Sequence, residues 1–142
     1  MQSRQGLFTA ALRVGGGGHK LGEMKTLAEV LVALVALLHG YFLVLEMFLW
    51  TTPYGRRVFK LTAEKAEATK ALAANQGLYN GFLAAGLIWG LLAGSDGYVI
   101  KVFFLSCVMI AGIFGAATVG KKILWVQAVP GAVALGLTCW VR

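Results

Sequence analysis

The chain has 142 residues, of which 58% are hydrophobic and 13% are charged, and its formal net charge is +7. Soluble domains contain roughly 45–50% apolar and about 25% charged residues. The composition therefore argues against a water-soluble domain, and it excludes a disordered chain, which needs low hydrophobicity and high charge. In so apolar a chain, basic residues mark the cytoplasmic loops of a membrane protein rather than a nucleic-acid surface. We expect a protein of the lipid bilayer with no nucleic-acid partner.

The first 24 residues differ from the rest of the chain. They include four consecutive glycines at 15–18, and they lack the long apolar core and the cleavage site of a signal peptide. Met24 stands directly before the first apolar segment and is an alternative start of translation. We expect residues 1–24 to be a disordered extension and residues 25–142 to form the transmembrane domain.

Four apolar segments follow, each close to the length of about 20 residues that a helix needs to cross the hydrocarbon core of a bilayer. A chain in lipid must satisfy its own backbone hydrogen bonds, so these segments are predicted to be helices. Short connections between the last three make neighbouring helices antiparallel. The sequence therefore predicts an all-α fold, a four-transmembrane-helix antiparallel bundle with helices at about 26–50, 71–94, 98–120 and 123–141.

The one long connection, residues 51–70, joins the first two predicted helices. Pro53 and Gly55 are expected to end the first helix, because both residue types interrupt helices. Thr62 is a good N-cap, and Glu64 suits the positive end of the helix dipole. We expect an amphipathic cytoplasmic extension that begins directly after Thr62 and runs into the second membrane helix.

The distribution of Lys and Arg predicts the orientation, since cytoplasmic loops carry an excess of them. Without the N-terminal extension, seven basic residues lie on one side of the bundle and three on the other. The seven are Arg56, Arg57, Lys60, Lys65, Lys70, Lys121 and Lys122. We therefore expect a multi-pass membrane protein with both termini outside. Arg56, Arg57 and Lys60 closely follow the first helix and are candidates for contact with lipid head groups.

Polar residues of three predicted helices meet at one level of the membrane, in its cytoplasmic half. His39 and Glu46 are seven residues apart and share one face of the first helix. The helical rise brings Asn75, Gln76 and, from the fourth helix, Gln127 to about the level of Glu46, and it brings Asn80 toward that of His39. We expect Glu46 to lie within hydrogen-bond reach of an amide of the second helix, namely Asn75, Gln76 or Asn80. An ionisable residue inside a span is costly and indicates function. The candidate polar pocket comprises His39, Glu46, Asn75, Gln76, Asn80 and Gln127.

The same residues predict no metal site and no cofactor. Two helical turns separate His39 from Glu46, about 10.5 Å along the helix axis, which is too far for one ion. The chain also lacks the Walker, GxGxxG, HExxH and GxSxG motifs of nucleotide, zinc and acyl-transfer chemistry.

Glycine recurs every four positions in the outer half of the second predicted helix, at Gly86, Gly90 and Gly94. Such faces let helix backbones approach closely. We expect this face to pack inside the bundle, and the alternative is a homo-oligomer formed through it.

The stretch HGYFLVLEMFLW at residues 39–50, followed by TTPYGRRVF and AANQGLYNGFLAAGLIWG, resembles a known family. It is the group of small four-helix bacterial and fungal integral membrane proteins catalogued as domain of unknown function 1304. The resemblance covers about residues 25–140. It implies a four-span membrane protein without an assigned activity, for which we expect the bacterial inner membrane. The signature positions that the resemblance implies are His39, Glu46, Trp50, Pro53, Asn75, Gln76, Gly77, Asn80 and Gly81.

Three functions stay open at this point. The first is a membrane protein, or an accessory subunit, whose pocket binds or handles a lipid-soluble small molecule such as a quinone or a lipid. The second is a small proton-coupled multidrug-type antiporter that uses Glu46, although Glu46 lies near the helix end rather than its centre. The third is a membrane enzyme resembling membrane glutathione transferases, whose arginine-rich motif is missing here. The sequence favours the first and leaves open whether the protein is an enzyme.

Overall fold

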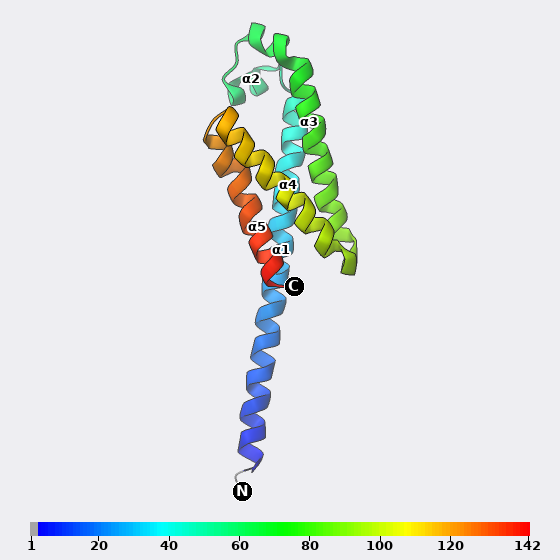
Figure 1. The fold of residues 1–142 in the computed structure, drawn as a ribbon, viewed down its shortest axis with the longest axis vertical. Coiled ribbons are helices and arrows are strands. Elements are labelled where there is room, and N and C mark those ends of the chain that lie inside the picture. Colours follow the sequence, from blue (N-terminus) through cyan, green and yellow to red (C-terminus); the bar gives the residue numbers. More distant parts are fainter. Residues whose placement is uncertain (1–2) are drawn as a thin grey trace.

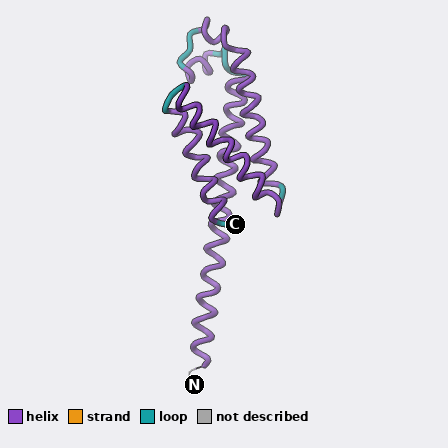
Figure 2. The backbone as a smooth tube through the Cα atoms, viewed as in Figure 1, coloured by secondary structure: helices purple, strands orange, loops and turns teal. Residues whose placement is uncertain are grey.

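The computed structural model describes the backbone of residues 3–142 and the side chains of residues 18–142. In chain order the elements are α1 (Ser3–Met47), α2 (Pro53–Phe59), α3 (Ala63–Leu92), the 3-10 helix η1 (Gly94–Asp96), α4 (Gly97–Thr118), the π-helical segment η2 (Leu124–Ala128) and α5 (Val129–Trp140). Every element in the described part of the chain is helical (Figure 2), which confirms the predicted all-α class.

The long helices α1, α3, α4 and α5 run alternately in opposite directions (Figure 1). Both α1 and α4 pack against α3 and α5, so each long helix has two neighbours. All four helices contribute to one buried apolar core, which consists of Val32, Val35, Ala36, Leu87, Leu105, Val108 and Ala134. The short side chains among them allow the helices to lie close together.

Helix α1 is longer than the first predicted helix and extends beyond the other helices toward the N-terminus (Figure 1). It begins at Ser3, and its residues 18–23 are exposed. Residues 1 and 2 lie outside the described part of the chain. The division of the protein into an extension (1–24) and a membrane domain (25–142) stays a prediction.

Two helices of the described chain are long and apolar enough to cross a membrane, namely Gly18–Met47 and Gly94–Thr118. The apolar segment Leu124–Trp140 is shorter. Helix α3 has the length, with 30 residues, but Asn75, Gln76 and Asn80 lower its hydropathy. By length and composition, the structure thus supports two of the four predicted spans.

The connection between α1 and α3 differs from the prediction. Helix α1 ends at Met47, before the predicted residue 50, and Pro53 begins the short helix α2. The Thr52 hydroxyl caps α2 by accepting a backbone N–H of its first turn, where proline removes no helical hydrogen bond. As predicted, Thr62 caps α3, and α3 runs without a break from the connection into the apolar segment.

The fourth predicted helix is also not uniform, because a π-helical turn precedes α5. Pro130 gives the physical reason. It has no N–H to donate to the carbonyl four residues earlier, and its ring clashes with that carbonyl, so the preceding turn widens. The widened turn packs closely on α4, since a Cβ atom at Gly112 would lie 2.7 Å from Ala128 N.

Candidate functional site

The site is built on a close approach of α1 and α3. A Cβ atom at Gly77 would lie 3.1 Å from Leu43 O and 3.2 Å from Glu46 Cβ, and one at Gly81 would lie 3.3 Å from Leu43 Cδ1. A side chain at position 77 would therefore press on the backbone of α1, and glycine permits the contact. Asn80, three residues after Gly77, shares this side of α3 and faces α1.

Asn80 and Glu46 form the central polar contact of the site. Asn80 Nδ2 donates a hydrogen bond of 2.7 Å to Glu46 Oε2. Asn80 is only 6% exposed, and Glu46 is half-buried. Within residues 18–142, no ion pair involves Glu46. The structure thus brings Glu46 together with Asn80, one of the three amides expected within its hydrogen-bond reach, and no basic side chain of the described residues neutralises the carboxyl group.

His39 lies two helical turns from Glu46 and is fully buried. Its Nδ1 is 2.8 Å from Val35 O. A carbonyl oxygen only accepts, so Nδ1 carries the proton and donates, which leaves Nε2 of the neutral ring as an acceptor. Nε2 is buried and has no hydrogen-bond partner among the described residues. No hydrogen bond among the described residues joins His39 to Glu46 or Asn80. The unpaired Nε2 of His39 is therefore a second buried polar group on α1.

Two predicted pocket residues lie elsewhere. Asn75 and Gln76 are exposed, which corrects the prediction that they line the pocket with Glu46. The helical rise sets the height of a residue along the axis, but its rotation about the axis is set by packing. On α3 the buried positions include Ala73, Gly77 and Asn80, at spacings of four and three residues. Asn75 and Gln76 fall outside this stripe.

Gln127, the remaining predicted pocket residue, is half-buried in the π-helical segment η2. No hydrogen bond in the described part of the chain joins it to Glu46 or Asn80. Nor do three His, Cys, Asp or Glu side chains of that part come together in a group that would hold a metal ion. What the structure shows of the predicted pocket is therefore the Glu46–Asn80 contact and the neighbouring His39.

Aromatic contacts that the sequence analysis missed hold α2 and the start of α3 against the end of α1. Trp50 Nε1 donates to Thr69 Oγ1 at 3.0 Å, and the hydroxyl groups of Tyr41 and Tyr54 lie 2.9 Å apart. A Cβ atom at Gly55 would overlap the backbone of the chain just before α2. No spacing rule links residues across a turn of this kind, so the sequence carried no signal for these contacts.

The three basic residues predicted to contact lipid head groups lie on and just after α2. Arg57 and Lys60 are exposed, whereas Arg56 is half-buried and its Nε is buried without a hydrogen-bond partner among the described residues. Contact with lipid head groups stays a prediction for all three.

The model of a protein family described as "Protein of unknown function (DUF1304)" matches residues 33–139. A similar relative is "Uncharacterized protein YpaA" of Lactococcus lactis subsp. lactis (strain IL1403), which is 33% identical over 106 residues, or 73% of this chain and 89% of the relative. No solved structure matches the chain. The matched region contains His39, Glu46 and Asn80.

Proposed function

We propose that this chain, which belongs to the family described as "Protein of unknown function (DUF1304)", is a four-span membrane protein in which Glu46 and Asn80 hold the polar end of a lipid-soluble small molecule. The observation that carries the proposal is the hydrogen bond of 2.7 Å from Asn80 Nδ2 to Glu46 Oε2. It places a carboxyl group without a basic partner between two helices of a very apolar chain.

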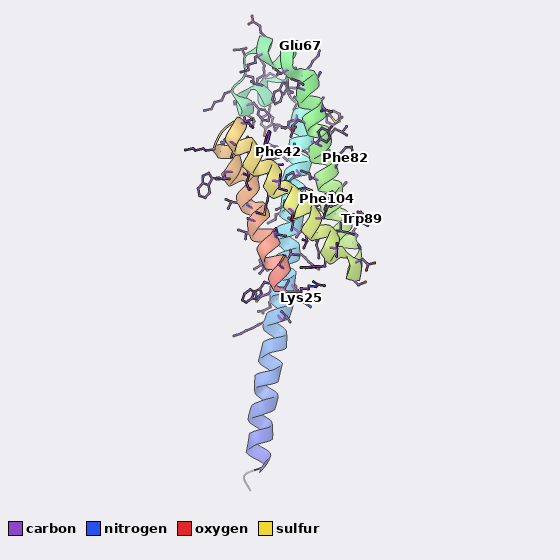
Figure 3. The ribbon with its side chains drawn as sticks, viewed as in Figure 1. Lys25, Phe42, Glu67, Phe82, Trp89 and Phe104 are labelled. Atoms are coloured by element: carbon purple, nitrogen blue, oxygen red, sulfur yellow. The ribbon has the colours of Figure 1, made fainter. Side chains whose placement is uncertain are left out.

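The apolar surface of the helices supports the membrane location. Only 28% of the apolar window in Gly18–Met47 and 17% of that in Gly94–Thr118 are buried, whereas the core helix of a soluble protein would be mostly buried. Phe82 and Trp89 project from the outer side of α3 (Figure 3) and are 56% and 60% exposed. Soluble monomers rarely expose apolar surface so extensively, and a bilayer would cover it. We extend this argument to α3 and to the segment Leu124–Trp140.

The positions of the basic residues support an orientation in the cell membrane. The end of the molecule that carries α2 also carries most of the Lys and Arg residues of the connections, so we place it in the cytoplasm. Both termini then lie outside. Because the family resemblance extends to bacterial proteins, we place the chain in the bacterial inner membrane.

The unused polar atoms of the site define the ligand that it would take. Asn80 occupies Glu46 Oε2, which leaves Glu46 Oε1 and the side-chain carbonyl oxygen of Asn80 as acceptors without a hydrogen-bond partner among residues 18–142. His39 Nε2 is a further buried acceptor. Leaving a buried acceptor unpaired costs about 1–3 kcal/mol. A small amphiphile with hydroxyl donors, such as a hydroquinone, would satisfy these acceptors while its apolar tail stays in lipid.

The test compares ligand binding by the full chain and two variants in discs of neutral lipid. The probe is decylubiquinol, the reduced form of a short-chain quinone, and its partition into empty discs is subtracted. Glu46→Gln keeps the shape of the side chain but removes the charge, so we expect roughly tenfold weaker binding. Glu64→Gln makes the same change at an exposed position in the first turn of α3 and should bind as the unchanged chain does. Equal binding by all three proteins would contradict the proposal.

The antiporter is not proposed, because of the position of Glu46 in α1. Glu46 is followed by only one further residue of α1, which ends at Met47. A carboxyl group in the last turn of a span lies near one membrane surface, whereas alternating access to both sides calls for a site near the midplane.

A further inference from the structure

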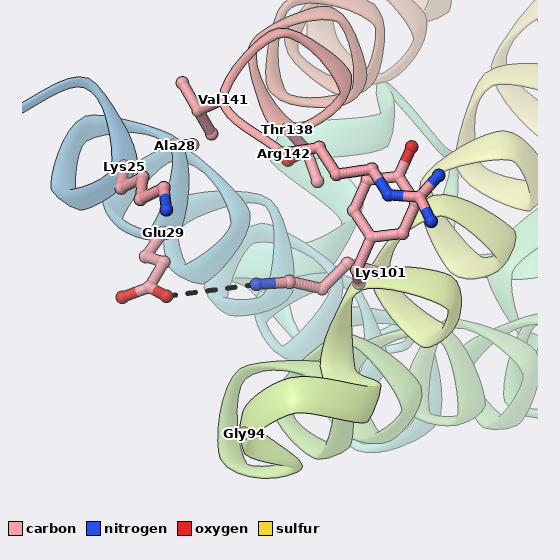
Figure 4. Close-up of a pocket in the computed structure, with 9 residues that line it drawn as sticks. Lys25, Ala28, Glu29, Gly94, Lys101, Thr138, Val141 and Arg142 are labelled. Carbon is pink, nitrogen blue, oxygen red and sulfur yellow. Dashed lines mark ion pairs between the residues drawn. The ribbon is translucent and has the colours of Figure 1, made fainter. Parts of the chain in front are cut away.

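A cavity of about 160 Å³ lies where helices α3, α4 and α5 end on the side away from α2 (Figure 1), and Figure 4 shows the side chains that line it. Its walls come from α1, from η1 and the start of α4, and from the end of α5 with the two residues after it. The side chains with charged or hydroxyl groups that line it are Lys25, Glu29, Tyr98, Lys101, Thr138 and Arg142. None of them belongs to the Glu46–Asn80 contact.

The cavity has an excess of positive charge. Three cationic side chains and one carboxylate line it, which leaves its side chains with a net charge of +2. The side chain of Lys101 is only 14% exposed, and its Nζ is 3.9 Å from Glu29 Oε1, whose side chain is 62% exposed. Buried charges in proteins are normally paired at hydrogen-bond distance. This pair is too long and too exposed to neutralise Lys101 fully.

Thr138 supplies an independent sign of a ligand. The residue is only 4% exposed and lines the cavity. A threonine inside a helix usually bonds to the carbonyl four residues earlier, but Thr138 Oγ1 has no hydrogen-bond partner among the described residues. Its hydroxyl is therefore a buried polar group without a protein partner, on a residue beside a positively charged cavity.

Arg142 is held at the cavity by an aromatic ring. Its guanidinium carbon lies 4.5 Å from the centre of the Tyr98 ring, a distance typical of a cation–π contact. Stacking on the ring leaves the N–H groups at the edge of the guanidinium free, and no ion pair in the described part of the chain involves Arg142. An edge of this kind binds two oxygens of one anion.

We propose that this cavity binds a phosphate group, held by Lys101, Arg142 and the hydroxyl of Thr138. Phosphate presents several acceptor oxygens and a charge of the opposite sign, which suits a lysine, an arginine fork and a hydroxyl donor. The cavity has room for a phosphate group and is open on one side, so any group attached to the phosphate would lie outside it. Both free inorganic phosphate and the head group of a phospholipid carry this chemistry. The proposal is independent of the function proposed for Glu46 and Asn80.

The first experiment titrates the full chain with inorganic phosphate in a neutral detergent at constant ionic strength, and follows binding by calorimetry. We expect saturable binding, which weakens at least about tenfold in Lys101→Gln and roughly threefold to tenfold in Thr138→Val. Thr138→Val removes a buried hydroxyl without a partner and keeps the shape of the side chain, so it should fold as well as the unchanged protein. Lys121→Gln, at an exposed position after α4 and therefore at the opposite end of that helix from Lys101, controls for the change in net charge and should bind normally.

The second experiment adds dihexanoyl phosphatidic acid in the same detergent. Tighter binding of this lipid, with competition by phosphate and the same order of the variants, assigns the site to a phospholipid head group. Equal binding of lipid and phosphate assigns it to the free anion. Both results support a phosphate site. The proposal is overturned if neither ligand binds saturably, or if Lys101→Gln and Thr138→Val both bind as the unchanged chain does.

Discussion

Gly77 of α3 lies against Glu46 of α1 so closely that a Cβ atom at position 77 would be 3.2 Å from Glu46 Cβ. This approach is what places Asn80, on the next turn of α3, within 2.7 Å of the Glu46 carboxylate. The hydrogen bond between Asn80 and Glu46 therefore depends on the glycine at position 77. A larger residue there should push α3 away from α1 and weaken this hydrogen bond.

The change Gly77→Ala should destabilise the protein, although alanine favours a helix by up to about 1 kcal/mol over glycine. The new Cβ atom would lie 3.1 Å from both Leu43 O and Met47 N, and such overpacking typically costs about 1–3 kcal/mol. Gly40→Ala is the control, because nothing lies within 4 Å of a Cβ atom there. Thermal unfolding in detergent should give a lower midpoint for Gly77→Ala and an unchanged or higher one for Gly40→Ala. Equal changes of the unfolding midpoint in the two variants would contradict the close contact between α1 and α3 at Gly77.

The hydrogen bond between Asn80 and Glu46 should appear as an energetic coupling. In a double-mutant cycle with Asn80→Leu and Glu46→Leu, each single change leaves the other polar group without its partner, while the double change removes both. We expect a coupling free energy of at least about 0.6 kcal/mol, the average for polar contacts between membrane helices. Unfolding in mixed detergent micelles measures it. Strictly additive effects would show that the two side chains do not interact.

The candidate site shows which parts of the structure a sequence can predict. Helix ends and a constant rise per residue predicted Asn75 and Gln76 at the height of Glu46 and Asn80 nearer to that of His39, with all three amides as candidate partners of Glu46. The structure joins Glu46 to Asn80. Asn75, which was predicted at the height of Glu46, is exposed, because the rotation of α3 depends on how Gly77 and Ala73 pack. That packing is a property of two helices together and cannot be read from one of them.

The short elements and the basic cavity were missed for different reasons. Helix α2 is too short to show periodicity, although Thr52 and Pro53 are a recognisable cap and first helical residue. Lys25, Lys101 and Arg142 belong to three distant parts of the chain, and the sequence analysis counted them only as charges that set the orientation. One signal was available, because Lys101 is the only charged residue in its apolar segment.

Gly86, Gly90 and Gly94 were predicted to form a packing or dimer face. Two of them, Gly86 and Gly90, are buried inside the molecule. A Cβ atom at Gly90 would lie 2.7 Å from Lys101 Cγ and 3.0 Å from Lys101 N, and one at Gly86 would overlap the ring of Phe104. Gly94 has a positive φ of 58° and lies in the turn before α4. A homo-oligomer through these residues stays a prediction, but Gly86 and Gly90 already have partners within the chain.

Gly90→Leu should therefore destabilise the monomer itself. A leucine there must displace Lys101 and the start of α4, and overpacking of this size costs about 1–3 kcal/mol or more. Gly136→Leu is the control, since nothing lies within 4 Å of a Cβ atom at that position of α5. Size-exclusion chromatography with light scattering in detergent separates the outcomes. If Gly90→Leu instead turns a dimer into a well-folded monomer, the face serves assembly.

The orientation in the membrane is testable with two single cysteines. Ser95 and Glu64 are both exposed and lie at opposite ends of α3, so the proposed topology places Ser95 outside and Glu64 in the cytoplasm. The background carries Cys107→Ala and Cys139→Ala, which removes both native thiols. A membrane-impermeant maleimide should label Ser95→Cys in intact cells, and it should label Glu64→Cys only after the membrane is opened.

The same assay tests the physical cause of the orientation. Seven basic residues in the connections are predicted to hold their side of the protein in the cytoplasm. Arg57 and Lys60 are exposed and not needed for a described contact, so changing both to glutamine should leave the fold intact and weaken this bias. We expect a fraction of the chains to expose the cysteine at position 64 to the outside. Labelling of Glu64→Cys in intact cells without these two changes would reverse the topology and place α2 outside.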